Sequence, residues 1–263
     1  MEDVHARQDE RGIAIDQVGI RNLRYPVVLL DRDRGKQQSI ATLELSVNLP
    51  HNFKGTHMSR FVEILDFHSG EFSMHTLPSI LRTLQERLQA ESARVVASFP
   101  YFMERVAPVS GSRSQLDYQC TFESEVNGAD EDFVLGVAVP VTTVCPCSKE
   151  ISDYGAHNQW GIIDVQLRTI SRTADEDIVW IEEVVEWAEA SGSAPLYPLL
   201  KRVDERFVTM QAYDNPVFVE DVVRNVALRL QADPRIAWFK VEALNNESIH
   251  NHDAFARVEW KRD

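Results

Sequence analysis

Two cysteines one residue apart and a histidine shortly after them are the residues whose spacing most clearly indicates chemistry. Cys145 and Cys147 flank a proline, and His157 follows on a segment with glycine and asparagine. Thiolate and imidazole are ligands that a borderline-soft divalent ion such as zinc prefers. A closed structural site usually needs four such ligands, but the third cysteine, Cys120, stands alone. This shortage indicates an open, catalytic metal site; two ordinary buried or strand cysteines are the competing interpretation.

Four blocks of the sequence resemble those of the prokaryotic type IB GTP cyclohydrolase I, in order and with compatible spacing. The matching residues are 54–61 (KGTHMSRF), 139–152 (VPVTTVCPCSKEIS) with 155–159 (GAHNQ), 199–205 (LLKRVDE) and 247–252 (ESIHNH). The resemblance runs from about residue 16 to the C-terminus. It implies a metal-dependent enzyme that converts GTP and water to dihydroneopterin triphosphate and formate. The product would enter folate or modified-nucleoside (queuosine) biosynthesis.

The resemblance also implies a ligand set. It assigns one divalent ion per active site, zinc, manganese or iron, to Cys145, His157 and Glu205. Without the resemblance, the charged run around Glu205 is typical of a solvated face. Cys147 has the ordinary interpretation of a small packed thiol, or it could form a reversible disulfide with Cys145, and Cys120 is expected in the core.

Further roles follow from the same resemblance. It implies that Cys145, Glu220 and His250 are catalytic, although an acid such as Glu220 is also expected near a helix N-terminus for electrostatic reasons. Glu247 would anchor the purine, since a carboxylate can accept hydrogen bonds from both the ring amide and the exocyclic amine of guanine. The other candidate substrate-binding residues are His252 and, for the triphosphate, Lys149, Lys201, Arg202 and Arg206. His57, in the first block, has no assigned chemistry, and a structural role is expected for it.

Composition narrows the class of protein. The 263 residues, 44% of them hydrophobic, suffice for one large domain or two small ones. No apolar run approaches the roughly 20 residues of a membrane span, and the polar N-terminus does not resemble a signal peptide. A cytoplasmic protein with reduced thiols is therefore expected. A formal net charge of -14 argues against nucleic acid and anionic membranes as partners, so a phosphate ligand needs a local basic pocket.

Apolar periodicity predicts two successive groups with the same order of elements: two strands, two helices, two strands. Strands are predicted at 20–30, 39–49, 94–103, 116–126, 133–141, 161–169, 237–244 and 254–260. Helices are predicted at 61–67, after a Thr76 cap, at 178–190 and after Pro216. This order predicts an α+β fold of two tandem modules, residues 15–128 and 129–263, after a mobile tail at 1–14. The resemblance implies tunnelling-fold modules, each an antiparallel sheet with paired helices. It also implies closure into barrels by oligomerisation, as a homotetramer with active sites at subunit interfaces.

Two alternatives remain open from the residues. Another tunnelling-fold enzyme could use Cys145 or Cys147 as a nucleophile, as nitrile reductases of this fold do. A non-catalytic purine or pterin binder with a structural metal is the second.

Overall fold

The computed structural model describes residues 8–68, 71–171 and 178–263. The strands are β1 (Ile15–Asp31), β2 (Gly35–Leu49), β3 (Glu71–Phe72), β4 (Ser92–Val106), β5 (Arg113–Asn127), β6 (Asp130–Val144), β7 (Asn158–Thr169), β8 (Ala194–Pro195), β9 (Ile236–Asn246) and β10 (Ala254–Lys261). The helices are α1 (Ser59–Phe67), α2 (Leu77–Leu88), α3 (Pro146–Ile151), α4 (Ile181–Glu189), α5 (Arg202–Asp214) and α6 (Val219–Ala232). None of these helices is long and apolar enough to cross a lipid bilayer.

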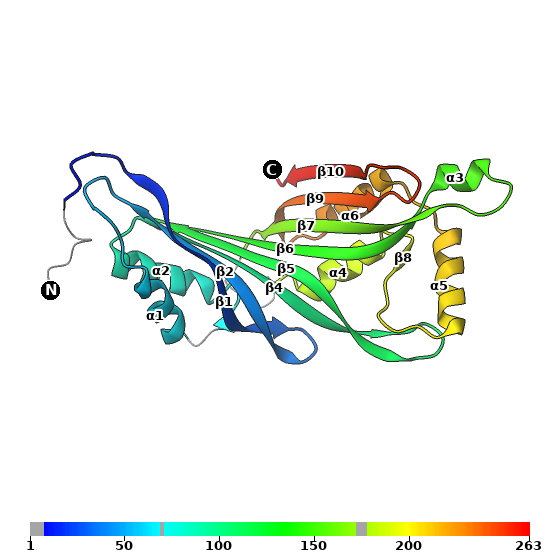
Figure 1. Ribbon diagram of the computed structural model, residues 1–263, viewed down its shortest axis with the longest axis horizontal. Helices are drawn as coiled ribbons and strands as arrows, with labels where there is room; N and C mark the ends of the chain where they lie inside the picture. The colour runs from blue at the N-terminus through cyan, green and yellow to red at the C-terminus, as the bar shows by residue number, and fades with distance from the viewer. Residues whose placement is uncertain (1–7, 69–70, 172–177) are drawn as a thin grey trace. The chain divides into compact units, whose positions relative to one another are not determined.

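The strands join in one sheet with the hydrogen-bonded order β10-β9-β7-β6-β5-β4-β2-β1-β3, and β8 pairs with β6 (Figure 1). The pairing is antiparallel between β1 and β2, β2 and β4, β7 and β9, and β9 and β10. Together with the six helices, this sheet confirms the predicted α+β class.

The chain divides into two compact units. One unit is Met1–Pro100 with Thr121–Leu135, and the other is Tyr101–Cys120 with Gly136–Asp263. Strands β4, β5 and β6, each 15 residues long, contribute residues to both units. The module boundary expected at residue 128 stays a prediction.

The predicted tail falls partly outside the described residues, which begin at Gln8. Gln8 forms an isolated antiparallel bridge with Phe53, and the backbone N–H of Asp9 donates to the carbonyl of Asn52 at 3.2 Å. The described end of this segment is therefore tied to the first unit.

In the long strands, buried and exposed residues alternate, as expected for a sheet with one face on the core. Leu43, Leu45 and Val47 of β2 are at most 2% exposed, as their spacing of two residues predicts. Cys120 of β5 is fully buried among the core residues, and burial raises the pKa of its thiol well above the ordinary value. The prediction of a core role for Cys120 is confirmed.

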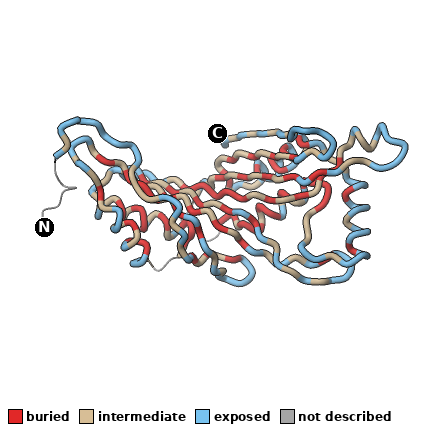
Figure 2. Tube along the Cα trace, viewed as in Figure 1, coloured by how far each residue is buried: buried red, intermediate tan, exposed pale blue. Residues whose placement is uncertain are grey.

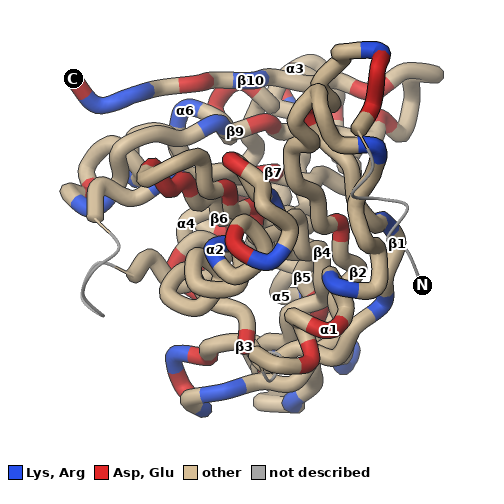
Figure 3. Tube along the Cα trace, turned by 90° about the vertical axis from the view of Figure 1, so that its left-hand side faces the viewer, with Lys and Arg blue, Asp and Glu red and all other residues tan. Residues whose placement is uncertain are grey.

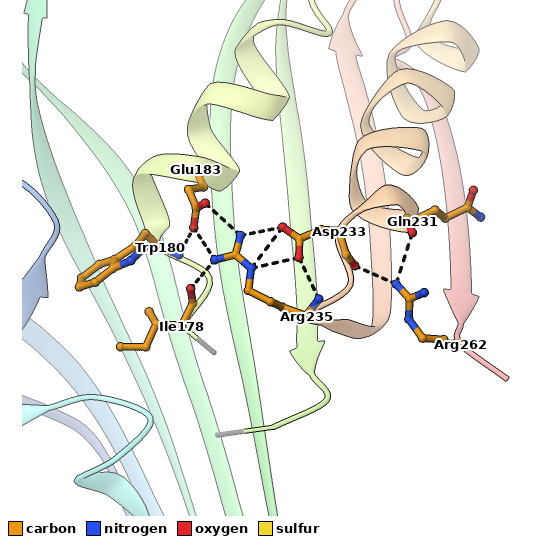
Figure 4. Close-up of polar contacts among 7 residues, drawn as sticks. All are labelled: Ile178, Trp180, Glu183, Gln231, Asp233, Arg235 and Arg262. Carbon is orange, nitrogen blue, oxygen red and sulfur yellow. Dashed lines mark hydrogen bonds and ion pairs between the residues drawn. The ribbon is translucent and has the colours of Figure 1, made fainter. Parts of the chain in front are cut away.

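In the second unit, helix α6 packs on β9 and β10 and touches α4. Its buried residues recur at helical spacing, as the sequence predicted, and they are Val219, Val222, Val223, Val226, Ala227 and Leu230. A polar network closes the turn after this helix (Figure 4). There the guanidinium of Arg235 donates to the Asp233 carboxylate at 2.6 Å and to that of Glu183 at 2.9 Å.

The structure differs from the sequence prediction in several elements. Helices α3 and α5 and the two-residue strands β3 and β8 were not predicted. The helix expected from 178 begins at Ile181. Thr76 does occupy the N-cap of α2, but its hydroxyl makes no capping bond and donates instead to the carbonyl of Glu71 at 2.8 Å.

Candidate functional site

The end of β6 brings Cys145 and His157 together. The backbone N–H of Cys145 donates to the carbonyl of His157 at 3.2 Å, so the connection between them closes on itself. Cys145 is the N-cap of the short helix α3, and its Sγ accepts from the Ser148 N–H at 3.4 Å. The hydroxyl of Ser148 accepts from the backbone N–H of His157 at 3.2 Å. Ser148 thus holds both predicted metal ligands in place.

Sheet register brings Glu247 to the same place. In the antiparallel β7–β9 pair, Trp160 lies opposite Asn246, so Gln159 and Glu247 meet at the next position. The Gln159 Nε2 donates to Glu247 Oε1 at 3.2 Å, and Glu247 Oε2 lies 3.9 Å from His157 Nδ1. The side chains of His157 and Glu247 are only 13% and 10% exposed. The carboxylate predicted to bind guanine is therefore sheltered beside a predicted metal ligand.

Gly161 leaves room for the Asn245 side chain, which lies opposite it on β9. A Cβ atom at Gly161 would lie 2.7 Å from the side-chain oxygen of Asn245, a residue that is itself buried. A larger residue at position 161 would force the Asn245 side chain to move.

The N-terminus of α6 reaches the same end of the sheet. The backbone N–H of Val217 donates to the carbonyl of Val144 at 3.1 Å, one residue before Cys145. Glu220 and Asp221 occupy the first turn of α6, and both acids interact favourably with the helix dipole there. Glu220 is exposed, so its carboxylate is accessible to a ligand.

Helix α5 covers the connection that carries Cys145 and His157. Its residues Val208 and Ala212 pack against Val144, Ala194 and Ala156 in one apolar cluster. Glu205 lies one turn before Val208 and is exposed. In Figure 1, α3 and α5 stand at the same end of the second unit. The third predicted ligand is therefore on a helix that packs against Val144 and Ala156, the residues that precede the other two predicted ligands.

Asp204 anchors the start of α5. It is fully buried, and its carboxylate accepts from the backbone N–H groups of Val109, Ser110 and Lys201 at 2.8–2.9 Å and from the Ser110 hydroxyl at 2.6 Å. These bonds fix the first turn of α5, and with it Glu205, to the turn between β4 and β5.

The basic candidates differ in their surroundings. The Lys149 ammonium donates to the carbonyl of Tyr213 at 2.5 Å and lies 4.3 Å from the centre of that ring. Lys201 and Arg202 are exposed at the start of α5. His250 and His252 are also exposed, with stacked rings whose centroids are 5.2 Å apart.

The chemical types of the donor groups at this site, a thiol, an imidazole and carboxylates, are those that bind divalent ions such as zinc. Cys145 and His157 adjoin each other. Across residues 8–68, 71–171 and 178–263, however, no three His, Cys, Asp or Glu side chains gather closely enough to hold an ion. A carboxylate on α5 would have to approach the pair for the expected set to form.

Sequence reasoning missed three residues that build this end of the sheet: Ser148, Gln159 and Asp204. Gln159 and Ser148 lie within the resembling blocks, but only the strand register and the helical turn show what they contact. For Asp204 the sequence offered one signal, an acid three residues after Lys201, the spacing of a helix cap.

The fold places the chain in the urate-oxidase-like, tunnelling-fold class of proteins. The uricase of Arthrobacter globiformis superimposes with a TM-score of 0.57 at 11% identity, covering 94% of each chain. The urate oxidase of Bacillus subtilis 168 gives 0.56 at 8% identity, covering 94% of this chain and 98% of that one. At this identity the likeness concerns the fold alone.

Sequence comparison identifies the family. A family model described as type I GTP cyclohydrolase folE2 matches residues 1–256. The chain is 49% identical over 260 residues to GTP cyclohydrolase FolE2 of Syntrophotalea carbinolica, covering 99% of this chain and 95% of that protein. It is 51% identical over 259 residues to GTP cyclohydrolase FolE2 of Kosmotoga olearia, covering 98% of each. The chain belongs to the type I GTP cyclohydrolase FolE2 family, as its resembling blocks predicted.

Proposed function

We propose that the chain is a GTP cyclohydrolase I, which converts GTP and water to dihydroneopterin triphosphate and formate in folate biosynthesis. The observation that carries the proposal is the gathering of Cys145, His157 and Glu247 at one end of the sheet, in a chain whose family match spans residues 1–256. These are the residues that the reaction needs to bind a purine and hydrolyse its imidazole ring.

A divalent ion, zinc, manganese or iron, completes the proposed site. Cys145, His157 and Glu205 would hold it, with Glu205 brought in by α5. When bound, such an ion lowers the pKa of water and so supplies hydroxide near neutral pH.

Glu247 binds the guanine base in this proposal. Its carboxylate is held by Gln159 through one oxygen and is mostly shielded from water, so hydrogen bonds to the base are strengthened. A carboxylate accepts from both the ring N–H and the exocyclic amine, which distinguishes guanine from adenine.

His250 and Glu220 handle protons. His250, on the loop after β9, donates a proton to the imidazole ring of guanine and makes its ring carbon more electrophilic. Water adds to that carbon, the ring opens, and a second hydrolysis releases formate. Glu220, exposed at the start of α6, carries protons between these steps, before the ribose rearranges and closes to the pterin ring.

The proposed active form is an oligomer, a homotetramer with active sites at subunit interfaces. The support is the sheet, whose order ends at β10 on one side. An open edge strand presents unpaired backbone groups to another chain.

The decisive experiment incubates metal-reconstituted protein with GTP. Formate release and a pterin that becomes fluorescent on oxidation are expected, with no turnover after chelation. Absence of formate with zinc, manganese and iron alike would reject the proposed activity. Turnover that persists after complete metal removal would instead favour a cysteine nucleophile.

A further inference from the structure

A polar cavity in the first unit takes no part in the site described above. It has a volume of about 390 Å³ and lies where β1 and β4 begin and where β2 and β5 end. The antiparallel pairing of β1 with β2 and of β2 with β4 brings strand ends of this kind together. Figure 3, viewed from this end of the strands, shows acidic and basic residues along the trace.

Three carboxylates line the cavity without a cationic partner. They belong to Asp16, Glu91 and Glu125, and none of them forms an ion pair or accepts a hydrogen bond through its side chain among the described residues. Glu125 is half-buried, whereas Asp16 and Glu91 are exposed. Carboxylates around one cavity repel each other, and a bound cation relieves that repulsion.

Arg94 also lines the cavity, but its charge is already balanced. Its Nη2 lies 2.9 Å from the Glu123 carboxylate, and its Nη1 lies 3.9 Å from that of Glu44. The guanidinium therefore does not neutralise the three carboxylates that line the cavity. This local excess of negative charge, in a chain whose formal net charge is -14, favours a cationic ligand over an anionic one.

A buried hydroxyl is a second, independent indication of a ligand. Ser46 lines the cavity and is only 4% exposed, and its Oγ has no hydrogen-bond partner among the residues that the structure describes. Leu45 and Val47 of β2 are buried in the core, so alternation places Ser46 on the opposite face of the sheet. There it lies opposite Arg94 of β4. Buried hydroxyl groups usually have a partner, and this one can accept an N–H from a bound molecule.

The spacing of the acids argues against a single metal ion as the ligand. No three His, Cys, Asp or Glu side chains in the described parts of the chain lie close enough together to share one. A ligand with several separate positive charges can instead reach carboxylates that stand apart. Ammonium groups joined by methylene links have this form, and an ammonium group offers donors without a competing acceptor.

We propose that this cavity binds a linear polyamine. Its ammonium groups pair with the three lining carboxylates, and one of them donates to the Ser46 hydroxyl. Hydrogen bonds between an ammonium and a carboxylate are charge-assisted, and a concave site of this volume encloses a small ligand. The lining residues belong to the first unit and include none of those proposed to act on GTP.

The test is calorimetric titration of the full-length protein with spermidine at low ionic strength. Glu125→Gln should weaken binding about three- to tenfold, because it removes a charge-assisted contact at a half-buried position. Ser46→Ala should weaken it about threefold. Asp117→Asn is the matched control, since Asp117 is exposed, lies outside the cavity and has no ion pair among the described residues. It loses the same unit of charge as Glu125→Gln and should bind spermidine like the parent.

Absence of spermidine binding by the parent would overturn the proposal. Equal losses in Glu125→Gln and Asp117→Asn would also overturn it, because they would show only the general attraction of an acidic chain for cations. If Glu125→Gln fails to fold, Glu91→Gln, at an exposed position, replaces it with the same expected direction.

Thermal unfolding provides a second measurement on the same proteins. Spermidine should raise the Tm of the parent and of Asp117→Asn more than that of Glu125→Gln, since a ligand that binds only the folded state stabilises it. Putrescine, with fewer ammonium groups, should bind the parent more weakly than spermidine. Equal affinity for the two amines would contradict joint binding by the three carboxylates.

Discussion

Asp204 and Ser110 lie 94 residues apart, and the Asp204 carboxylate accepts both the backbone N–H of Ser110 at 2.8 Å and its hydroxyl at 2.6 Å. The hydroxyl bond is of the short, charge-assisted kind. Through this contact the turn between β4 and β5 fixes the first turn of α5. The next residue on that helix is Glu205, the proposed metal ligand.

We therefore expect Asp204→Ala to reduce both stability and metal content. Removing the carboxylate leaves the N–H groups of Val109 and Ser110 without their acceptor, and α5 loses its anchor. The measurements are thermal unfolding and metal content after reconstitution. Ser110→Ala, which removes only the hydroxyl bond, is the graded control and should show a smaller loss of both. Full metal content in Asp204→Ala would show that Glu205 does not depend on this anchor.

Cys145→Ala should abolish metal binding and GTP turnover with little loss of stability. The thiol is half-buried and accepts only one weak bond, from the Ser148 N–H at 3.4 Å, so its removal costs the fold little. The assays are metal content, formate release and thermal unfolding.

Cys147→Ala serves as the control for that variant, because Cys147 is exposed and two residues away. It should retain metal. Normal metal content and turnover in Cys145→Ala would remove Cys145 from the ligand set.

The long strands and the α6 helix were predictable because the pattern of their buried residues is visible in the sequence. Alternate residues of β2 face the core, and every third or fourth residue of α6 does so. Helix α5 has no such pattern, since its buried residues are only Asp204 and Ala212 (Figure 2). From the sequence alone, a charged run with one buried acid looks like a solvated loop. Only the structure shows that the buried acid, Asp204, binds the turn between β4 and β5.

Only some residues of the candidate site were predictable from the sequence. Family motifs named Cys145, His157 and Glu247, but no local pattern indicates that Gln159 meets Glu247. That contact depends on the β7–β9 register, in which Trp160 faces Asn246. Residues this far apart in the sequence meet only if the register of the two strands is known. A shift of one residue would turn Gln159 to the other face of the sheet.

Asp233→Asn should lower stability at neutral pH and have a smaller effect in acid. The hydrogen bond from the Arg235 side chain holds the pKa of Asp233 below its ordinary value of 3.8, so the ionised form stabilises the fold. That contribution is fully present above about pH 4 and is lost as the pH falls through the lowered pKa. Thermal unfolding of parent and variant at pH 7 and pH 3 checks this; a difference that grows in acid would contradict the assigned direction.

The proposed assembly predicts an active species whose mass is a multiple of 30.0 kDa. Within the described residues, strand β10 pairs with β9 on one side only, and such an edge is a template for another strand. Light scattering coupled to size-exclusion chromatography, with formate assays on the same fractions, tests the prediction. A fully active monomer would rule out interface active sites.

Glu247→Gln should damage the use of GTP far more than it damages the fold. The Gln159 amide can still donate to the new side-chain oxygen, which preserves the contact at 3.2 Å. Toward guanine, however, the substituted amide offers one acceptor and one opposing donor where the carboxylate offered two acceptors. Loss of a charge-assisted bond with an unpaired donor costs about 2–4 kcal/mol, or roughly 30- to 1000-fold in kcat/KM. Gln159→Ala is the companion variant, expected to lower kcat/KM less, because it only frees the carboxylate. Unchanged kcat/KM in Glu247→Gln would exclude base recognition by Glu247, and a collapse of its unfolding temperature would show a structural role instead.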